Sequence, residues 1–234
     1  MPELPAPLAP DKRTTGQLVA ESIRFYGDHF WRVVPLGVPL LVANQASVHH
    51  QAIGPQMLIY WAATPLFVAA YVRACRLVLD ARPNRVAVLL AVLIWLPFPA
   101  LRAFYLLPAI AWLAFIGLAV PAAMDDPSLR FRDALVRGRR LGTVDYVHAL
   151  GSLAALVIVV VLADTTLSSL LHTQSATGAR VALGLSDLVL SPLLFVGGAL
   201  LYVDQAARVG SRHADLHPPV DADRAGRPDP QVEP

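Results

Sequence analysis

Long apolar stretches alternate along the chain with short stretches rich in arginine. Six of the apolar stretches approach the ~20 residues that a helix needs to cross a hydrocarbon core of ~30 Å. Their expected bounds are 31–48, 57–78, 86–101, 104–124, 147–163 and 181–203. The stretch 86–101 is the shortest, so local thinning of the bilayer or snorkelling flanks must accommodate it. The pattern predicts an all-α fold, a polytopic membrane helical bundle with six transmembrane helices.

Basic residues lie mainly in every second loop between the predicted spans. Of the 19 Lys and Arg residues, 17 fall on the side that holds both termini, and only Arg102 and Arg180 fall on the other. Cytoplasmic loops carry the excess of Lys and Arg in membrane proteins. We therefore expect a multi-pass protein of the cytoplasmic membrane whose N-terminus and C-terminus are both cytoplasmic.

A first amphipathic segment precedes the first predicted span. Thr14 and Gln17 have the spacing of a capping box, which starts a helix by satisfying its free amide groups. Apolar residues then recur on one face, at Val19, Ile23, Tyr26 and Phe30. The opposite face is polar, so the pattern predicts a helix lying in the cytoplasmic membrane interface.

A second amphipathic segment follows the fourth predicted span. Asp126 and Pro127 are expected as N-cap and first helical turn. One face then carries Phe131, Leu135, Gly138 and Gly142, and the other carries Arg130, Asp133, Arg137 and Arg140. A second interfacial helix is predicted, with Arg130, Arg137 and Arg140 as candidate contacts to anionic lipid headgroups. A solvated face, or packing against the bundle, is the alternative.

Spans two and six share a local pattern. Thr64-Pro65-Leu66-Phe67 and Ser191-Pro192-Leu193-Leu194 are each followed by Tyr-Val and an arginine. The match favours an internal duplication, in which interfacial helix, span, outer loop and span recur around spans three and four. Chance similarity of apolar segments is the alternative. Residues 1–13 and 209–234 are rich in Pro and polar residues, so we expect disordered tails around a membrane domain of residues 14–208.

Composition supports the membrane prediction. The chain of 234 residues is 56% hydrophobic and 15% charged, and its mean hydropathy is +0.53. Soluble domains have about 45–50% apolar and about 25% charged residues. Eighteen of the 19 basic residues are Arg, which together with the Ala and Pro content indicates a bacterial source. Cys75 is the sole cysteine, so no intramolecular disulfide forms.

Local motifs of common catalytic sites are absent from the sequence. It contains no GxSxG, HExxH, P-loop or dinucleotide-binding pattern. We therefore expect no enzyme activity, no cofactor, no metal and no nucleic-acid partner. Scattered side chains that bind metals in other proteins leave a metal-dependent membrane enzyme as a minor alternative. They are His49, His50, Asp164, His172 and Asp187.

Three polar residues fall inside predicted spans. Asn44 and Gln45 lie late in the first span, and Asp187 lies six residues inside the last. A charge at mid-bilayer costs ~2.5–3.5 kcal/mol, and such residues often mark a function. They are therefore candidate functional residues, and contact between spans one and six would let the two amides hydrogen-bond Asp187. A purely structural role in joining helices is the alternative.

Several short motifs resemble one family. They are residues 20–26 (AESIRFY) with Phe30-Trp31, Val120-Pro121-Ala122 leading to Asp125 or Asp126, Asp133-Ala134-Leu135 leading to Arg140-Leu141, and Tyr202-Val203-Asp204 leading to Arg208. Together they resemble the membrane domain of glycerophosphoryl diester phosphodiesterases and related uncharacterised six-span bacterial integral membrane proteins, over about residues 15–210. The chain departs from that pattern at Gly138, where the family has Ser. The resemblance implies architecture, but the phosphodiesterase catalytic barrel is absent from this chain, so it does not imply that activity.

These observations favour a non-enzymatic accessory or assembly component of the bacterial cell envelope. The alternative is a transporter, or a permease subunit working with a cytoplasmic ATPase, because proline in five of the six spans suits helices that rearrange. Anionic lipid is the expected partner. A further membrane or cytoplasmic protein partner, the substrate and the oligomeric state stay open.

Overall fold

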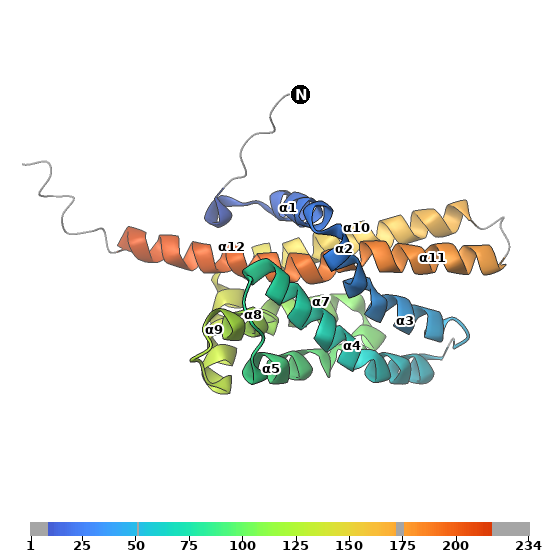
Figure 1. Ribbon diagram of the computed structural model, residues 1–234, viewed down its shortest axis with the longest axis horizontal. Coiled ribbons are helices and arrows are strands. Elements are labelled where there is room, and N and C mark those ends of the chain that lie inside the picture. Colours follow the sequence, from blue (N-terminus) through green and yellow to red (C-terminus); the bar gives the residue numbers. More distant parts are fainter. Residues whose placement is uncertain (1–8, 51, 172–175, 217–234) are drawn as a thin grey trace, which may run out of the picture.

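A computed structural model of the chain describes residues 9–50, 52–171 and 176–216, and its regular elements are all helices (Figure 1). The all-α prediction is confirmed for this part of the chain. In chain order the helices are η1 (Pro10–Lys12), α1 (Thr15–Asp28), α2 (Phe30–Val33), η2 (Val34–Gly37), α3 (Val38–Ser47), α4 (Ile53–Leu79), α5 (Arg85–Trp95), α6 (Phe98–Phe104), α7 (Leu106–Ile116), α8 (Ala119–Asp125), α9 (Phe131–Val144), α10 (Tyr146–Leu170), α11 (Ala176–Leu190) and α12 (Pro192–Leu216).

Five helical segments in the described residues are long and apolar enough to cross a membrane. They are Ile53–Leu79, Arg85–Ala103, Leu106–Asp125, Tyr146–Leu167 and Thr177–Ser211. The shortest has 19 residues, about 28 Å at ~1.5 Å per residue, which nearly matches a ~30 Å hydrocarbon core. The chain is therefore a multi-pass membrane protein.

The segment expected as the first span is broken. Residues 31–48 pass through α2, the 3₁₀ turn η2 and the ten-residue helix α3. Pro35 lies in η2 and Pro39 begins α3, and proline removes the amide that an unbroken helix would need. No single helix of spanning length forms there.

Breaks in three later spans follow residues that disfavour a continuous helix. Pro97 lies between α5 and α6, Gly117 ends α7, and Ser191 separates α11 from Pro192 at the start of α12. Helix α4, by contrast, runs through Pro65 without interruption. Proline thus accompanies breaks in some spans and leaves α4 continuous.

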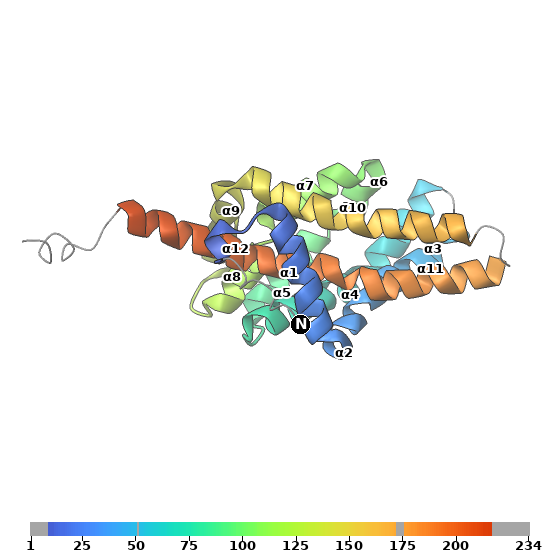
Figure 2. The same cartoon turned by 90° about the horizontal axis from the view of Figure 1, so that it is seen from above.

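Helix α4 lies at the centre of the bundle. It contacts α3, α5, α8 and α12, while α10 runs beside α11 and α12 on the outer side (Figures 1 and 2). Its buried face carries Tyr60, Phe67 and Tyr71, which follow one another at seven and four residues. This aromatic face fills the middle of the bundle.

Helix α1 forms as the capping box predicts, with the Thr14 backbone N–H donating to Gln17 Oε1 at 2.7 Å. It crosses α10 and α12 steeply and packs against both (Figure 2). The buried side is the line of Leu18, Ser22 and Tyr26. Of the predicted apolar stripe only Tyr26 lies on this side, and Ile23 is 51% exposed. The bundle covers one side of α1 and leaves the apolar residues beside it for lipid.

Helix α9 forms, but its predicted start is wrong: it begins at Phe131, with Arg130 at the N-cap. Helix α8 extends to Asp125, so Asp126 instead closes the turn, its carboxylate accepting from the N–H of Ser128 at 3.1 Å and from its hydroxyl at 2.6 Å. These two hydrogen bonds, with a smaller effect of Arg137, hold the pKa of Asp126 below its ordinary value. The turn is thus fixed by a charged carboxylate.

Close packing holds α9 against the bundle. A Cβ on Gly138 would lie 2.3 Å from the Cα of Ala119 in α8, so only glycine fits there. The packing alternative for α9 is therefore correct for this face. Of the arginines expected on the other face, Arg137 is half-buried, and Arg130 and Arg140 are exposed.

Parts of both predicted tails are folded. Pro10–Lys12 form a 3₁₀ turn, and α12 continues to Leu216, past the expected boundary at residue 208. Contacts with the bundle, described below for Arg13 and Arg208, order these parts. Residues 1–8 and 217–234, where the rest of the predicted disorder falls, lie outside the described residues.

Candidate functional site

The polar residues predicted inside the membrane meet between α3, α4 and α11. The Asn44 amide donates to Asp187 Oδ1 at 2.8 Å, and the Tyr60 hydroxyl donates to Asn44 Oδ1. The predicted contact between Asn44 and Asp187 is confirmed. Gln45 does not reach the carboxylate, because its amide donates instead to the backbone oxygen of Arg180 at 3.0 Å.

A second polar pair joins α10 to α11. The Ser186 hydroxyl donates to Asp164 Oδ1 at 2.5 Å, and Ser186 is adjacent in sequence to Asp187. Both membrane carboxylates therefore have a neutral hydrogen-bond donor. Neither forms an ion pair within the described residues.

A cavity of about 490 Å³ opens beside these pairs, inside the bundle. Its lining comes from α3, α4, α5, α6, α7, α10 and α12 and is mostly aliphatic and aromatic. Five lining side chains carry strong polar groups, and three of them lie together because Tyr60 contacts both Asn44 and Arg102: Asn44, Gln56, Tyr60, Arg102 and Asp164. The cavity is therefore amphipathic, with a polar end and an apolar body.

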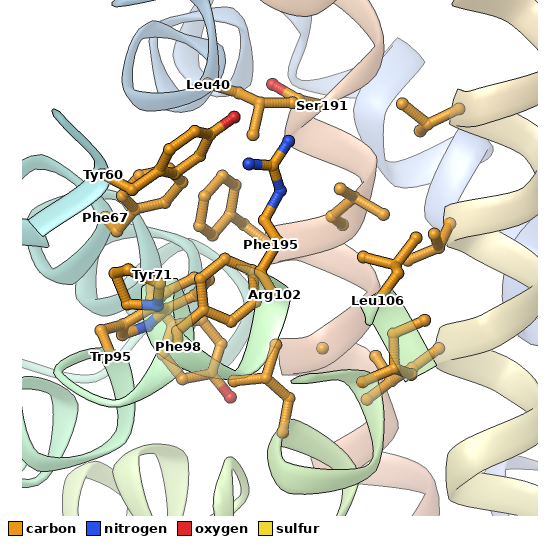
Figure 3. A pocket seen from close by; sticks show the side chains of 18 of the residues that line it. Leu40, Tyr60, Phe67, Tyr71, Trp95, Phe98, Arg102, Leu106, Ser191 and Phe195 are labelled. Atoms are coloured by element: carbon orange, nitrogen blue, oxygen red, sulfur yellow. The ribbon is translucent and has the colours of Figure 1, made fainter. Parts of the chain in front are cut away.

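An aromatic wall borders the apolar body. The ring of Phe67 lies 5.1 Å from Trp95 and 6.3 Å from Phe195, and Trp95 lies 4.9 Å from Phe98. Such offset and tilted ring pairs are stable packing geometries. Tyr71 closes the wall by donating its hydroxyl to the Gly117 backbone oxygen at 2.9 Å, at the break between α7 and α8. Aliphatic residues of α7 and α10 line the cavity across from this wall (Figure 3).

Arg102 brings the charge of the site. Its guanidinium lies 4.0 Å above the centre of the Tyr60 ring, and Figure 3 shows it pointing into the space between Tyr60 and Ser191. The side chain is half-buried, and no carboxylate among the described residues pairs with it. A cation over an aromatic face is stabilised by the ring quadrupole, but the donors of the guanidinium stay available to a ligand.

Two further donors in the lining have no partner among the described residues. The Ser191 hydroxyl and the Trp95 indole N–H are buried without a hydrogen bond, although both residues line the cavity. Ser191 reaches this position because the chain breaks there, between α11 and α12. Most buried polar groups in proteins are hydrogen-bonded, so these two suggest a ligand or water.

The opposite end of the bundle is held by charged pairs. Arg13 lies 3.1 Å from the buried Asp204, and Arg208 lies 2.8 Å from Asp145. Arg137 pairs with Asp125 at 3.2 Å. The Tyr202 hydroxyl also donates to Asp125, at 2.7 Å. We call these residues the ion-paired end.

Several residues that carry the family resemblance meet at the ion-paired end, including Asp125, Tyr202, Asp204 and Arg208. The three candidate headgroup contacts differ in their surroundings. Arg137 forms ion pairs with Asp125 and Asp126, whereas Arg130 and Arg140 are exposed. The motif residues therefore stabilise this end of the fold, and the cavity lies elsewhere.

Sequence reasoning missed Arg102, Tyr60 and Ser191 as site residues. Arg102 did carry a signal, because it is one of two basic residues on the side poor in charge. Tyr60 and Ser191 had none, since their placement follows from how α4 and α12 meet. Among the described residues no three His, Cys, Asp or Glu side chains gather as a metal site would require, and His172 lies outside them.

Comparisons with known proteins found no matching family model, no similar curated protein and no similar solved structure. The resemblance to the phosphodiesterase membrane domain thus rests on the motif residues alone.

Proposed function

We propose that this chain is a non-enzymatic component of the bacterial cell envelope that binds one amphiphilic membrane molecule inside its helical bundle. The observation that carries the proposal is the cavity, with polar side chains at one end and apolar side chains over the rest of its wall. Small-molecule sites are typically apolar hollows of ~300–1,000 Å³ with a few placed polar groups. A molecule with a polar head and a hydrocarbon body fits that distribution.

The proposed setting is the cytoplasmic membrane, crossed six times, with the broken segment α2–η2–α3 as the first span. Contacts at the ion-paired end support a shared side for the termini, because Arg13 precedes α1 and contacts Asp204 and Arg208 near the end of α12. This end holds most of the arginines, so it is proposed to be cytoplasmic. Single cysteines in a Cys75→Ala background test the orientation: His50→Cys should label from outside and Ser128→Cys only after permeabilisation. External labelling of the second would reject the orientation.

The family resemblance and the internal duplication belong to the same proposal. In both halves an amphipathic helix, α1 or α9, precedes two segments, which are α2–α3 and α4 in the first half and α10 and α11–α12 in the second. Four of the motif residues, Asp125, Tyr202, Asp204 and Arg208, lie at the ion-paired end, which supports a shared architecture. The exposed Arg130 and Arg140 would face anionic headgroups there.

A matched pair of tryptophan substitutions on α10 tests the binding proposal. Val157 lines the cavity, whereas Ile158 is 55% exposed on another side of the same helix. Val157→Trp should fill the cavity, and Ile158→Trp should leave it open. The protein is purified from native membranes in mild detergent, and the molecules that remain bound are identified by mass spectrometry.

The expected result is an amphiphile bound to the wild-type protein and to Ile158→Trp but lost from Val157→Trp. Equal retention by both variants, or no amphiphile on the wild-type protein, would reject the proposal. Thermal unfolding of each variant shows that the compared proteins are folded.

A transporter is the second candidate, and the breaks in the spans favour it. Three breaks, at Pro97, Gly117 and Ser191, lie beside the cavity. Transporters bind substrate between interrupted helices. Reconstituted vesicles separate the two candidates, because a transporter moves a labelled amphiphile between leaflets and an accessory binding protein does not.

A further inference from the structure

Resting on the proposed function, we infer that the cavity takes a single-chain amphiphile whose head is an anion, a carboxylate or a phosphate, held by Arg102. Three features of the cavity carry the inference: the sign of its charge, the hydrogen-bond donors that it offers, and its length and volume.

The sign of the charge follows from how the nearby ionisable groups are partnered. Asp187 accepts from Asn44 and Asp164 accepts from Ser186, so both carboxylates are already stabilised by neutral donors. Arg102 lies over the face of the Tyr60 ring, and the Asp187 carboxylate attracts it without an ion pair between them. A half-buried guanidinium within the membrane region gains most from an anion, and it can bind carboxylate or phosphate through two parallel hydrogen bonds.

The other free groups are also donors. The indole N–H of Trp95 can only donate, and the hydroxyl of Ser191 can donate or accept. Both are unpartnered in the lining among the described residues. Gln56 is already engaged, since its amide donates to the His50 backbone oxygen at 2.6 Å. Ser191 therefore offers a donor beside Arg102, and Trp95 offers one further along the aromatic wall, so the lining calls for a ligand with acceptor oxygens.

The part of the cavity beyond Arg102 fits one leaflet. The lining on α4 begins at Ile53, but its part from Tyr60, over which Arg102 lies, to Tyr71 is roughly 16 Å along a helix that rises ~1.5 Å per residue. Half of a ~30 Å hydrocarbon core is about the same length. A head at Arg102 thus leaves a hydrocarbon chain to run along the aromatic wall over one leaflet (Figure 3).

The volume selects one chain over two. At ~30 Å³ per group, the share of one water in the liquid, 490 Å³ accommodates roughly sixteen groups. That is about the number of carbons in one acyl chain without its head, and about half the number in two chains. A two-chain phospholipid is too large for the cavity.

Four probes test the inference on the full-length wild-type protein by titration in native mass spectrometry. Oleate and oleoyl lysophosphatidate are single-chain anions with a carboxylate and a phosphate head. Monoolein is a neutral single-chain probe, and dioleoyl phosphatidate is an anion with two chains. The two single-chain anions should bind at least about tenfold more tightly than the other two, and their order identifies the head.

Substitutions then assign the head to its residues. Arg102→Gln should weaken the two single-chain anions by ~10- to 100-fold, as expected for a hydrogen bond to a charged group, and leave monoolein unchanged. Arg102→Lys should restore part of the loss. Arg180→Gln is the control, because Arg180 is the other arginine of that side, is exposed and does not line the cavity. Ser191→Ala, a milder change, should weaken the anions by ~2- to 10-fold.

The outcomes separate this inference from the proposed function. Equal binding of monoolein and the anions, or no effect of Arg102→Gln in a folded protein, overturns the anionic head. Equal binding of dioleoyl phosphatidate overturns the single chain. In these cases the loss of amphiphile from Val157→Trp would still support the proposed function. Failure of Val157→Trp to weaken any bound probe would reject the proposed function itself.

Discussion

At the ion-paired end of the bundle Arg13, Arg137 and Arg208 each lie within 3.2 Å of a carboxylate, whereas Arg102 in the cavity half lies over an aromatic ring. The carboxylates differ in the same way. Asp204 is fully buried and pairs with an arginine, while Asp187 in the cavity half accepts from an amide. Each of these three arginines thus has a carboxylate partner in the protein, whereas Arg102 has none within ion-pair distance among the described residues.

This difference indicates a division of labour along the bundle. Removing one partner of a buried ion pair leaves a charge without compensation and costs stability. Interhelical hydrogen bonds in membranes are worth much less, about 0.6 kcal/mol on average. Substitutions at the ion-paired end should therefore unfold the protein more readily, and substitutions in the cavity half should mainly change what it binds.

The largest effect is expected for Arg13→Leu. Asp204, with a fully buried side chain, would lose its ion pair, for which a loss of ~3–5 kcal/mol is typical. We expect the free energy of unfolding in detergent, measured thermally or with denaturant, to fall by about 3 kcal/mol, the lower end of that range. The reason is that Arg208 still holds this segment by donating to the Arg13 backbone oxygen. Lys12→Leu is the control, since Lys12 is exposed and its replacement should change stability by no more than ~0.5 kcal/mol. Equal stability of the two variants would contradict the comparison.

A smaller loss is expected for Gly138→Ala, which probes the docking of α9. The new Cβ would meet the backbone of Ala119 at 2.3 Å, and overpacking of this kind costs ~1–3 kcal/mol. Gly27→Ala in α1 is the matched control, because its Cβ would meet nothing within 4 Å. That control should stabilise the protein by up to ~1 kcal/mol through helix propensity. Opposite signs of the two changes are the result to look for.

In the cavity half Asp187→Leu should cost less again. The bond from Asn44 belongs to a class that averages ~0.6 kcal/mol and reaches ~1.7 at most. A double-mutant cycle with Asn44→Ala measures this coupling in detergent. Residual function that follows the folded fraction indicates a structural role, whereas a folded but inactive protein indicates a role in transport. A coupling as large as that of Arg13 with Asp204 would abolish the distinction between the two ends.

The sequence anticipated the features that depend on local pattern. Apolar runs and the capping box at Thr14 act over a few residues, so they predicted five membrane-spanning segments and the start of α1, but not the breaks in the first segment. The depth of Asn44 and Asp187 in their spans predicted their contact, because two polar groups at similar depth in lipid favour each other.

Features that depend on packing between distant segments were not anticipated. The side of α1 that is buried is the side that packs on α10 and α12. The polar Ser22 is therefore buried and the apolar Ile23 is exposed, the reverse of what their polarity alone predicts. The cavity arises where seven helices fail to fill space, which no local pattern encodes. Gly138 departs from the Ser of the resembling family, and the close approach of Ala119 supplies a physical reason that only the fold reveals.

The smallest effects are expected on the exposed face of α9, where some arginines pair with carboxylates of the protein and others are free to contact lipid. Each basic residue near an anionic membrane surface is worth about 1 kcal/mol. Arg140→Gln should therefore lower thermal stability more in nanodiscs of anionic lipid than in neutral ones. Arg137→Gln should lower it equally in both, by no more than ~1 kcal/mol, because Arg137 already pairs with Asp125 and Asp126 at partly exposed positions. Added salt should reduce the lipid-dependent difference for Arg140. The same lipid dependence for both variants would mean that Arg137 binds lipid headgroups despite its ion pairs. The charges of the ion-paired end would then be as available to ligands as that of Arg102 in the cavity.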